Sequence, residues 1–193
     1  LGGLWGWRSS FLFFGLLSLS LSTLFLNTTP QKLEKTRMPG GIRDAAKVPG
    51  LWTLLVYNMA VGLYYKGVDF IFPTFLERKN FSPMVTGFAV SCVLGVGILG
   101  QWLSGKVSDL VGPKKVLVAT SIGITLGLIF LQIIPAPIVG VSLFILFYGF
   151  SFYGHQPALN SLAGLITPDD LRGTVFGVLF FLSFGLGSLS MAI

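Results

Sequence analysis

The amino-acid sequence predicts an all-α protein that crosses a membrane several times, and three observations lead to this fold class. Only 10% of its 193 residues are charged, whereas soluble domains carry about 25%. Hydrophobic residues make up 53% of the chain, and the mean hydropathy is +0.82. Apolar windows of roughly 20 residues, long enough for a helix to span a bilayer, recur along the whole sequence.

Six such windows cover most of the chain, at residues 4–26, 51–73, 84–104, 116–135, 138–160 and 173–193. The third, fourth and sixth contain no Asp, Glu, Lys or Arg. Six helices leave too few residues for a separate soluble domain. The sequence starts at Leu1 and stops at Ile193 inside apolar runs, and no signal peptide is recognisable. We therefore expect a fragment of a longer membrane protein.

The positive charges indicate which loops face the cytoplasm. The larger group comprises Lys32, Lys35, Arg37, Arg43, Lys47, Lys106, Lys114, Lys115 and Arg172, and the smaller comprises Arg8, Arg78 and Lys79. Cytoplasmic loops are enriched in basic residues, so the net charge of +6 sets the orientation and indicates no nucleic-acid partner. We expect a multi-pass protein of the plasma (inner) membrane, with 30–48, 105–115 and 167–172 cytoplasmic and 75–82 outside.

Three connections between the windows have recognisable chemistry. Residues 27–50 hold seven charges, three prolines and three glycines, which is typical of a linker. The segment 135–137 predicts a tight outer turn. The segment 166–173 predicts the start of a helix, with Thr167 as its cap and Pro168 in its first turn. Asp169 and Asp170 then lie at the positive end of the helix dipole, which favours their negative charge. Arg172 and Gly173 follow them.

Small residues recur at four-residue spacing in two windows. Gly87, Ser91 and Gly95 do so in the third window, and Gly173 and Gly177 at the start of the sixth. In lipid, small residues at this spacing let helix backbones approach closely. The pattern fits static packing and sliding helices equally well.

The stretch GKVSDLVGPKK between the third and fourth windows carries a recognisable motif. Gly105, Asp109, Gly112, Lys114 and Lys115 follow the pattern G-x-x-x-D-x-x-G-x-[KR]-[KR]. This pattern resembles the cytoplasmic loop signature of the major facilitator superfamily of secondary transporters. Leu110 and Pro113 stand where the family usually has basic residues, and this departure resembles the weaker second copy of the signature, between helices eight and nine.

The resemblance extends over nearly the whole chain and implies helices six to eleven of a twelve-helix transporter. Residues 1–26 then end the N-terminal half, 27–50 form the central cytoplasmic loop, and 51–193 form a truncated C-terminal half. The family works by alternating access driven by an ion or solute gradient. The implied partners are the lipid bilayer, a small-molecule substrate, a coupling ion such as a proton, and the missing N-terminal half. The motif is expected to act as a latch between the halves, and no cofactor or ATP site is expected.

Ionisable groups inside a membrane span are costly, so each is a functional hypothesis. Asn58, Gly62, Tyr65 and Asp69 share one face of the second predicted helix, and Lys66 lies at the edge of that face. Asp69 or Lys66 then binds a substrate or a proton, or the two form an ion pair. Alternatively both lie near the outer interface and extend to water.

The fifth predicted helix offers a second polar segment, FYGFSFYGHQPALN. Tyr148, Ser151 and His155 share one face, and Tyr153, Gln156 and Asn160 share another. Pro157 removes a helical hydrogen bond and favours a kink. His155 is able to carry a coupling proton near neutral pH, or is a hydrogen-bonded structural group.

The motifs of enzymes are not found in this sequence. We see no glycine-rich phosphate loop, no metal-spaced His and Cys cluster and no Ser/His/Asp set, and the single cysteine, Cys92, excludes a disulfide. We therefore predict a transporter with no catalytic or metal site. The alternative is a membrane sensor or scaffold of the same fold that binds a ligand without moving it.

Overall fold

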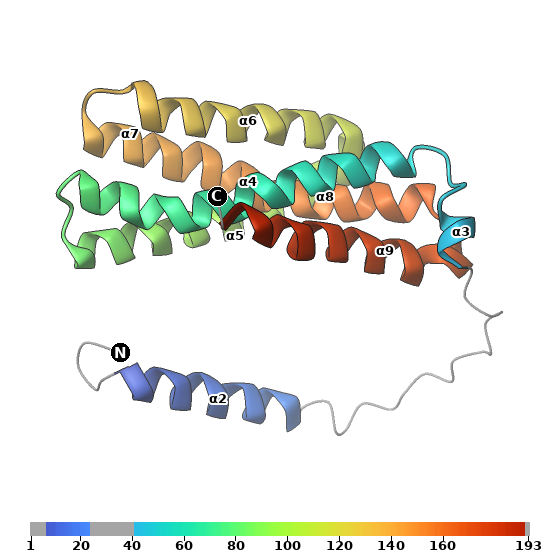
Figure 1. Ribbon diagram of the computed structural model, residues 1–193, viewed down its shortest axis with the longest axis horizontal. Coiled ribbons are helices and arrows are strands. Elements are labelled where there is room, and N and C mark those ends of the chain that lie inside the picture. The colour runs from blue at the N-terminus through green and yellow to red at the C-terminus, as the bar shows by residue number, and fades with distance from the viewer. Residues whose placement is uncertain (1–6, 24–40, 192–193) are drawn as a thin grey trace. The chain divides into compact units, whose positions relative to one another are not determined.

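The computed structural model describes residues 7–23 and 41–191, which are helical apart from short connections (Figure 1). The chain divides into two units, Leu1–Arg37 and Met38–Ile193. The described part of the first is α2 (Trp7–Thr23). The second contains α3 (Ile42–Ala45), α4 (Leu51–Arg78), α5 (Pro83–Val111), α6 (Pro113–Ile133), α7 (Pro137–Phe144), the π-helical turn η2 (Ile145–Gly149), α8 (Phe150–Ile166), the 3-10 turn η3 (Asp169–Leu171), α9 (Arg172–Phe180), the π-helical turn η4 (Phe181–Gly185) and the 3-10 turn η5 (Leu186–Met191).

The all-α fold class is confirmed. Four helical runs are long and apolar enough to cross a membrane: Pro83–Val111, Pro113–Ile133, Pro137–Ile166 and Asp169–Ser190. With 28 residues, α4 has the length but is not in this group, and it carries the polar residues predicted to line a pathway. In α2 the apolar stretch is shorter, Phe11–Thr23. The remainder of the predicted first window, and Lys32, Lys35 and Arg37 of the predicted linker, lie outside the described residues.

Two helices run further than the sequence predicted. Helix α4 continues to Arg78 rather than ending at 73, and α5 continues to Val111 rather than 104. The motif stretch 105–115 therefore comprises the end of α5, one turn residue and the start of α6. The reversal takes place at Gly112, whose φ of 91° suits glycine because it lacks a Cβ, and Pro113 opens α6.

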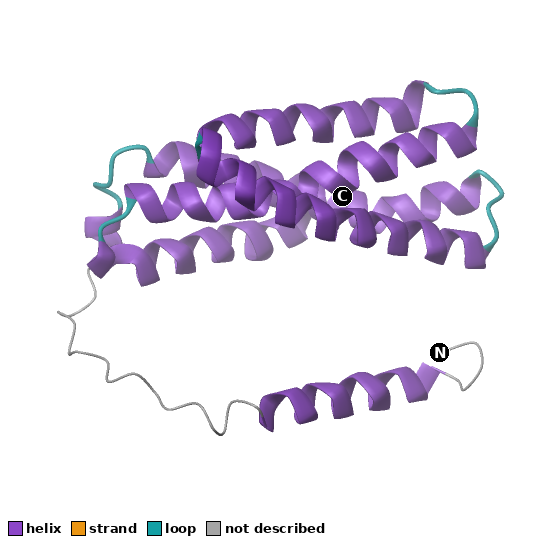
Figure 2. Cartoon of the chain, turned by 180° about the vertical axis from the view of Figure 1, so that it is seen from behind, coloured by secondary structure: helices purple, strands orange, loops and turns teal. Residues whose placement is uncertain are grey.

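The helices of the second unit form a bundle around the run from α7 through α8. Helix α8 packs along α5 and α6, while α4 packs along η4 and η5. Figures 1 and 2 show the connections gathered at the two ends of the bundle. One end holds α3, the Gly112 turn and residues 167–168, and the other holds residues 79–82 and 134–136. All the segments of this unit that are predicted to be cytoplasmic thus share one end.

Glycines let the α7–α8 run lie against both neighbouring helices. A Cβ added at Gly100 of α5 would lie 2.1 Å from the carbonyl oxygen of Phe150. One added at Gly127 of α6 would lie 2.7 Å from the backbone nitrogen of Tyr148. Real Cβ atoms do not come so close, so a side chain at either site would push two backbones apart. In lipid, burying apolar surface removes no contact with water, so helices associate through the packing that close backbone approach allows.

The stripes of small residues singled out from the sequence are not the ones that make these contacts. A Cβ added at Gly87, Gly95, Gly173 or Gly177 meets no atom within 4 Å in this structure. Ser91 is exposed, and its hydroxyl donates to the carbonyl of Gly87 at 2.9 Å. Within the described residues these stripes therefore do not serve close packing. The spacing was right for packing, but the sequence did not show which face of α5 turns inward.

A pair of glycine substitutions on α5 tests this packing. We expect Gly100→Ala to destabilise the protein by about 1–3 kcal/mol because the new methyl overlaps the α8 backbone. Gly95→Ala is the matched control: it lies in open space on the same helix, and it should be neutral or stabilising because alanine favours helix. Thermal unfolding of the purified protein in detergent measures both. Equal stability of the two variants would contradict the packing described above.

Candidate functional site

Three of the predicted pathway residues, Tyr65 and Asp69 of α4 and Tyr148 of η2, border a cavity of about 260 Å³. Residues of α5 and of the α7–η2–α8 run complete its wall. The lining comprises Tyr65, Val68, Asp69, Phe72, Val90, Val93, Leu94, Phe144, Tyr148 and Tyr153. We call this space the Asp69 cavity. Asp69 is its single charged residue and is exposed, and it lies nine residues before the end of α4, about 14 Å at 1.5 Å per residue.

Three tyrosines, Tyr65, Tyr148 and Tyr153, line the Asp69 cavity. The Tyr65 hydroxyl lies near both the Asp69 carboxylate and the Tyr153 hydroxyl. Tyr148 is 2% exposed, and its hydroxyl oxygen is buried without a hydrogen-bond partner. From the sequence, Tyr153 was placed on a different face from Tyr148. Tyrosines 65, 148 and 153 come from two separate helical segments, so no spacing in the sequence could have grouped them.

A column of stacked aromatic rings fixes these tyrosines. Tyr148 stacks on Phe144 at 4.6 Å between ring centroids and on Phe152 at 5.5 Å. Phe152 in turn stacks on Tyr65 at 4.4 Å. Tyr148 belongs to the π-helical turn η2, and such turns occur often at functional sites. The column connects α4 to the central helical run, and stacking on both ends of the column orients the rings of Tyr65 and Tyr148.

Lys66 does not line the cavity. Its Nζ lies 5.0 Å from the centroid of the Tyr65 ring and 5.6 Å from that of Phe184 in η4. The ion pairs in the described residues are Lys47–Asp44 and Arg172–Asp169, so none joins Lys66 to Asp69. Of the alternatives that the sequence left open, a direct pair between Lys66 and Asp69 is not formed here.

Asn58 is buried and hydrogen-bonded, and it does not line the Asp69 cavity. It is 3% exposed, and its Nδ2 donates to the carbonyl oxygen of Leu179 at 2.6 Å. The carbonyl lies just before the π-helical turn η4, where the regular helical ladder is interrupted. Asn58 therefore supplies a hydrogen bond at the crossing of α4 and α9.

His155 and Gln156 lie apart from the Asp69 cavity. His155 is fully buried, its Nδ1 meets the carbonyl oxygen of Phe152, and its Nε2 is without a partner. The ring of Tyr57 lies edge-on at 6.4 Å. Gln156, with Pro157 and Asn160, borders a shallow hollow beside Trp102 of α5. The second polar segment therefore contributes Tyr148 and Tyr153 to the Asp69 cavity, whereas His155 and Gln156 do not line it.

The residues of the loop motif lie at the end of the bundle that holds α3. Gly105 and Asp109 belong to the last two turns of α5, and Asp109 is exposed. Lys114 and Lys115 begin α6 and are exposed. Within the described residues the motif makes no ion pair. A latch would therefore need groups outside the described part of the chain.

The predicted helix start at 167–173 is formed differently from the expectation. Thr167 does not cap: its hydroxyl oxygen is buried and has no partner. Instead the carbonyl of Pro168 accepts from the Leu171 nitrogen at 3.0 Å, which opens the 3-10 turn η3. Asp169 pairs with Arg172 at 2.9 Å, and both side chains are exposed. Asp170 lies in the same first turn and Gly173 follows in α9.

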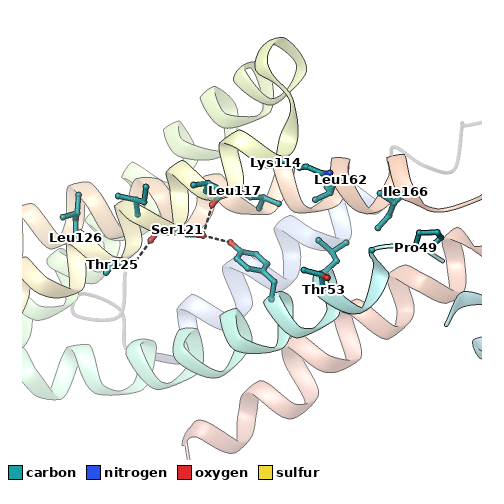
Figure 3. A pocket seen from close by; sticks show the side chains of 14 residues that line it. Pro49, Thr53, Lys114, Leu117, Ser121, Thr125, Leu126, Leu162 and Ile166 are labelled. Atoms are coloured by element: carbon teal, nitrogen blue, oxygen red, sulfur yellow. Dashed lines mark hydrogen bonds between the residues drawn. The ribbon is translucent and has the colours of Figure 1, made fainter. Parts of the chain in front are cut away.

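A larger groove, about 870 Å³, lies between α4, α6 and α8 (Figure 3). Three of its hydroxyls, those of Tyr57, Ser121 and Thr125, are hydrogen-bonded. Tyr57 and Ser121 share a hydrogen bond of 3.1 Å, Ser121 donates to the carbonyl of Leu117, and Thr125 to that of Ser121. Lys114 is the charged residue in its lining. The sequence reading missed this groove, although Ser121 and Thr125 at four-residue spacing were a possible signal.

Comparison with known proteins agrees with the helical bundle and the polar groups inside it. The sequence matches the Major Facilitator Superfamily over residues 1–191. The chain therefore belongs to this superfamily of membrane transporters.

Curated relatives of this chain include efflux pumps of mycobacteria. The multidrug efflux pump Tap of Mycobacterium tuberculosis (strain H37Rv) is 26% identical over 189 residues, which cover 92% of this chain and 44% of the relative. The pump of the same name from Mycolicibacterium fortuitum is 24% identical over 152 residues, covering 78% of this chain and 37% of the relative. The chain thus spans less than half the length of these relatives. No solved structure gives a significant match.

The buried hydrogen bond of Asn58 leads to a prediction about stability. We expect Asn58→Ala to lower the free energy of unfolding by about 1–3 kcal/mol because the carbonyl of Leu179 loses its partner. Gln101→Ala, at an exposed position on α5, removes an amide without this effect and is the control. Thermal unfolding measures both. If Asn58→Ala were as stable as wild type but defective in transport, the residue would belong to the pathway instead.

Proposed function

We propose that this chain belongs to a secondary transporter that exports small molecules across the plasma (inner) membrane by alternating access. Membership of the superfamily and the mycobacterial efflux pumps support transport and its outward direction. The observation that carries the proposal is the Asp69 cavity. A carboxylate far inside a transmembrane helix is costly unless it faces a pathway or a partner group.

The proposed parts of the molecule follow the family architecture. Residues 1–26 end the N-terminal half of the transporter, 27–50 link the halves in the cytoplasm, and 51–193 form most of the C-terminal half. Substrate sites in such transporters lie near the bilayer midplane, between halves that rock against each other. Exposed Asp69 on α4 is suited to face such a pathway.

The driving force is proposed to be an ion gradient, with a proton as the coupling ion. Two groups in the bundle are able to exchange a proton, Asp69 at the cavity and His155 in the interior. His155 is fully buried and remote from the cavity, whereas Asp69 is exposed. Access to water favours Asp69 as the group that exchanges protons during transport.

Export and the role of Asp69 are tested in liposomes containing the complete protein. Flux is measured with cationic, neutral and anionic amphipathic dyes under an imposed proton gradient. We expect gradient-dependent export, and we expect Asp69→Asn to abolish most of it because the carboxylate is lost. Glu77→Gln removes an exposed carboxylate from the same helix, outside the cavity, and should behave like wild type. Ligand binding without flux of any dye would support a sensor instead.

The loop motif leads to a separate kinetic prediction. If Asp109 latches the two halves of the transporter, Asp109→Asn should slow turnover and leave the equilibrium affinity for substrate nearly unchanged. Lys47→Ala is a control at the same end of the bundle, because Lys47 pairs only with exposed Asp44. A large loss of affinity in Asp109→Asn at unchanged turnover would overturn the latch.

A further inference from the structure

The charge of Asp69 is not matched by a cation of the described chain. Neither ion pair in the described residues involves it, and the other residues that line its cavity are uncharged. Lys66 attracts the carboxylate only from outside the cavity, because its Nζ lies over the rings of Tyr65 and Phe184. The side of the carboxylate that faces the cavity is therefore available to a positively charged group of a bound ligand.

Hydroxyl oxygens at the cavity are available as hydrogen-bond acceptors, and the rings of Tyr65 and Tyr148 are occupied by stacking. Phe144 and Phe152 stack on Tyr148, and Phe152 and the Lys66 ammonium lie over Tyr65, so these rings have little free face. Their hydroxyls are different. Those of Tyr65 and Tyr153 lie near each other at the cavity, while the hydroxyl of Tyr148 is buried behind its wall. Recognition here depends on hydrogen bonds to oxygen, and a ligand with N–H donors is suited to supply them.

The rest of the cavity is apolar. Apart from Asp69 and the tyrosines, the lining consists of valine, leucine and phenylalanine. A Mg²⁺ or Ca²⁺ ion needs six or more oxygen ligands, and one carboxylate in an apolar wall does not provide them. A volume of about 260 Å³ suits a small charged group with part of its apolar stem.

We propose that the Asp69 cavity binds the protonated amino group of a small amphipathic amine, which donates to the Asp69 carboxylate and to tyrosine hydroxyls. The apolar part of the amine lies against the aliphatic and phenyl wall. This inference rests on the proposed transport function and names a substrate class for the same site. A quaternary ammonium has the same charge but no N–H, so the site discriminates against it.

Three matched probes test the proposal on the purified complete protein at pH 7: benzylammonium, benzyltrimethylammonium and benzyl alcohol. Binding is measured by isothermal titration calorimetry. We expect benzylammonium to bind about tenfold or more tightly than either of the others, because each of them lacks the charge-assisted N–H hydrogen bond. Equal binding of benzylammonium and benzyltrimethylammonium would overturn the proposal, as would tighter binding of the alcohol.

Substitutions assign the binding to this cavity. We expect Asp69→Asn to weaken benzylammonium binding about tenfold or more and Tyr153→Phe a few-fold, with little effect on the alcohol. Asp69→Glu keeps the charge and should retain part of the affinity, and Glu77→Gln is the control. Unchanged affinity in a folded Asp69→Asn protein would refute the site.

The flux assay separates the failure of this inference from the failure of the proposed function. If neutral dyes are exported but benzylammonium binds no better than the other probes, transport stands and the amine site is wrong. If benzylammonium binds as described and no dye is exported, the amine site stands and export is wrong.

Discussion

The close backbone contact of the central α7–α8 run with α5 and α6 is the constraint on which the rest of the bundle depends. Gly100 and Gly127 make room for that run from two sides. In lipid there is little gain from burying apolar surface, so helices associate where their backbones approach closely. This contact fixes the rotation of the central run, and the rotation places Tyr148, Phe152 and Tyr153 on the side that faces α4.

The irregular turn η2 and the column of stacked aromatic rings position the side chains that line the Asp69 cavity. The π-helical turn lies within an otherwise regular run of 30 residues and carries Tyr148. Stacked rings connect Tyr148 through Phe152 to Tyr65, one turn before Asp69 on α4. The rings of Tyr65 and Tyr148 are thereby held by stacking beside Asp69. Such preorganisation reduces the ordering that a ligand must impose on binding.

The bundle keeps its polar groups in separate places with different surroundings. Asn58 and His155 are buried and bonded to backbone carbonyls, whereas Asp69 is exposed beside a cavity. The groove between α4, α6 and α8 is larger, but the hydroxyls of Tyr57, Ser121 and Thr125 are already hydrogen-bonded and most of its lining is apolar. Size alone would favour the groove as a functional site, and the unmatched charge favours the Asp69 cavity.

The sequence by itself determined the fold class, the family and the helices, because apolar length and the Gly105–Lys115 motif are local properties of the chain. It also selected Asp69, since a charge in an apolar segment is visible without a structure. It did not determine which glycines pack, that α5 continues through the motif to Val111, or that Thr167 leaves the cap unformed. Only the tertiary structure decided that Tyr153 joins Tyr65 while Lys66 does not line the cavity and Asn58 is buried. These outcomes depend on how each helix is rotated against its neighbours, and that rotation is set by contacts between residues far apart in the sequence.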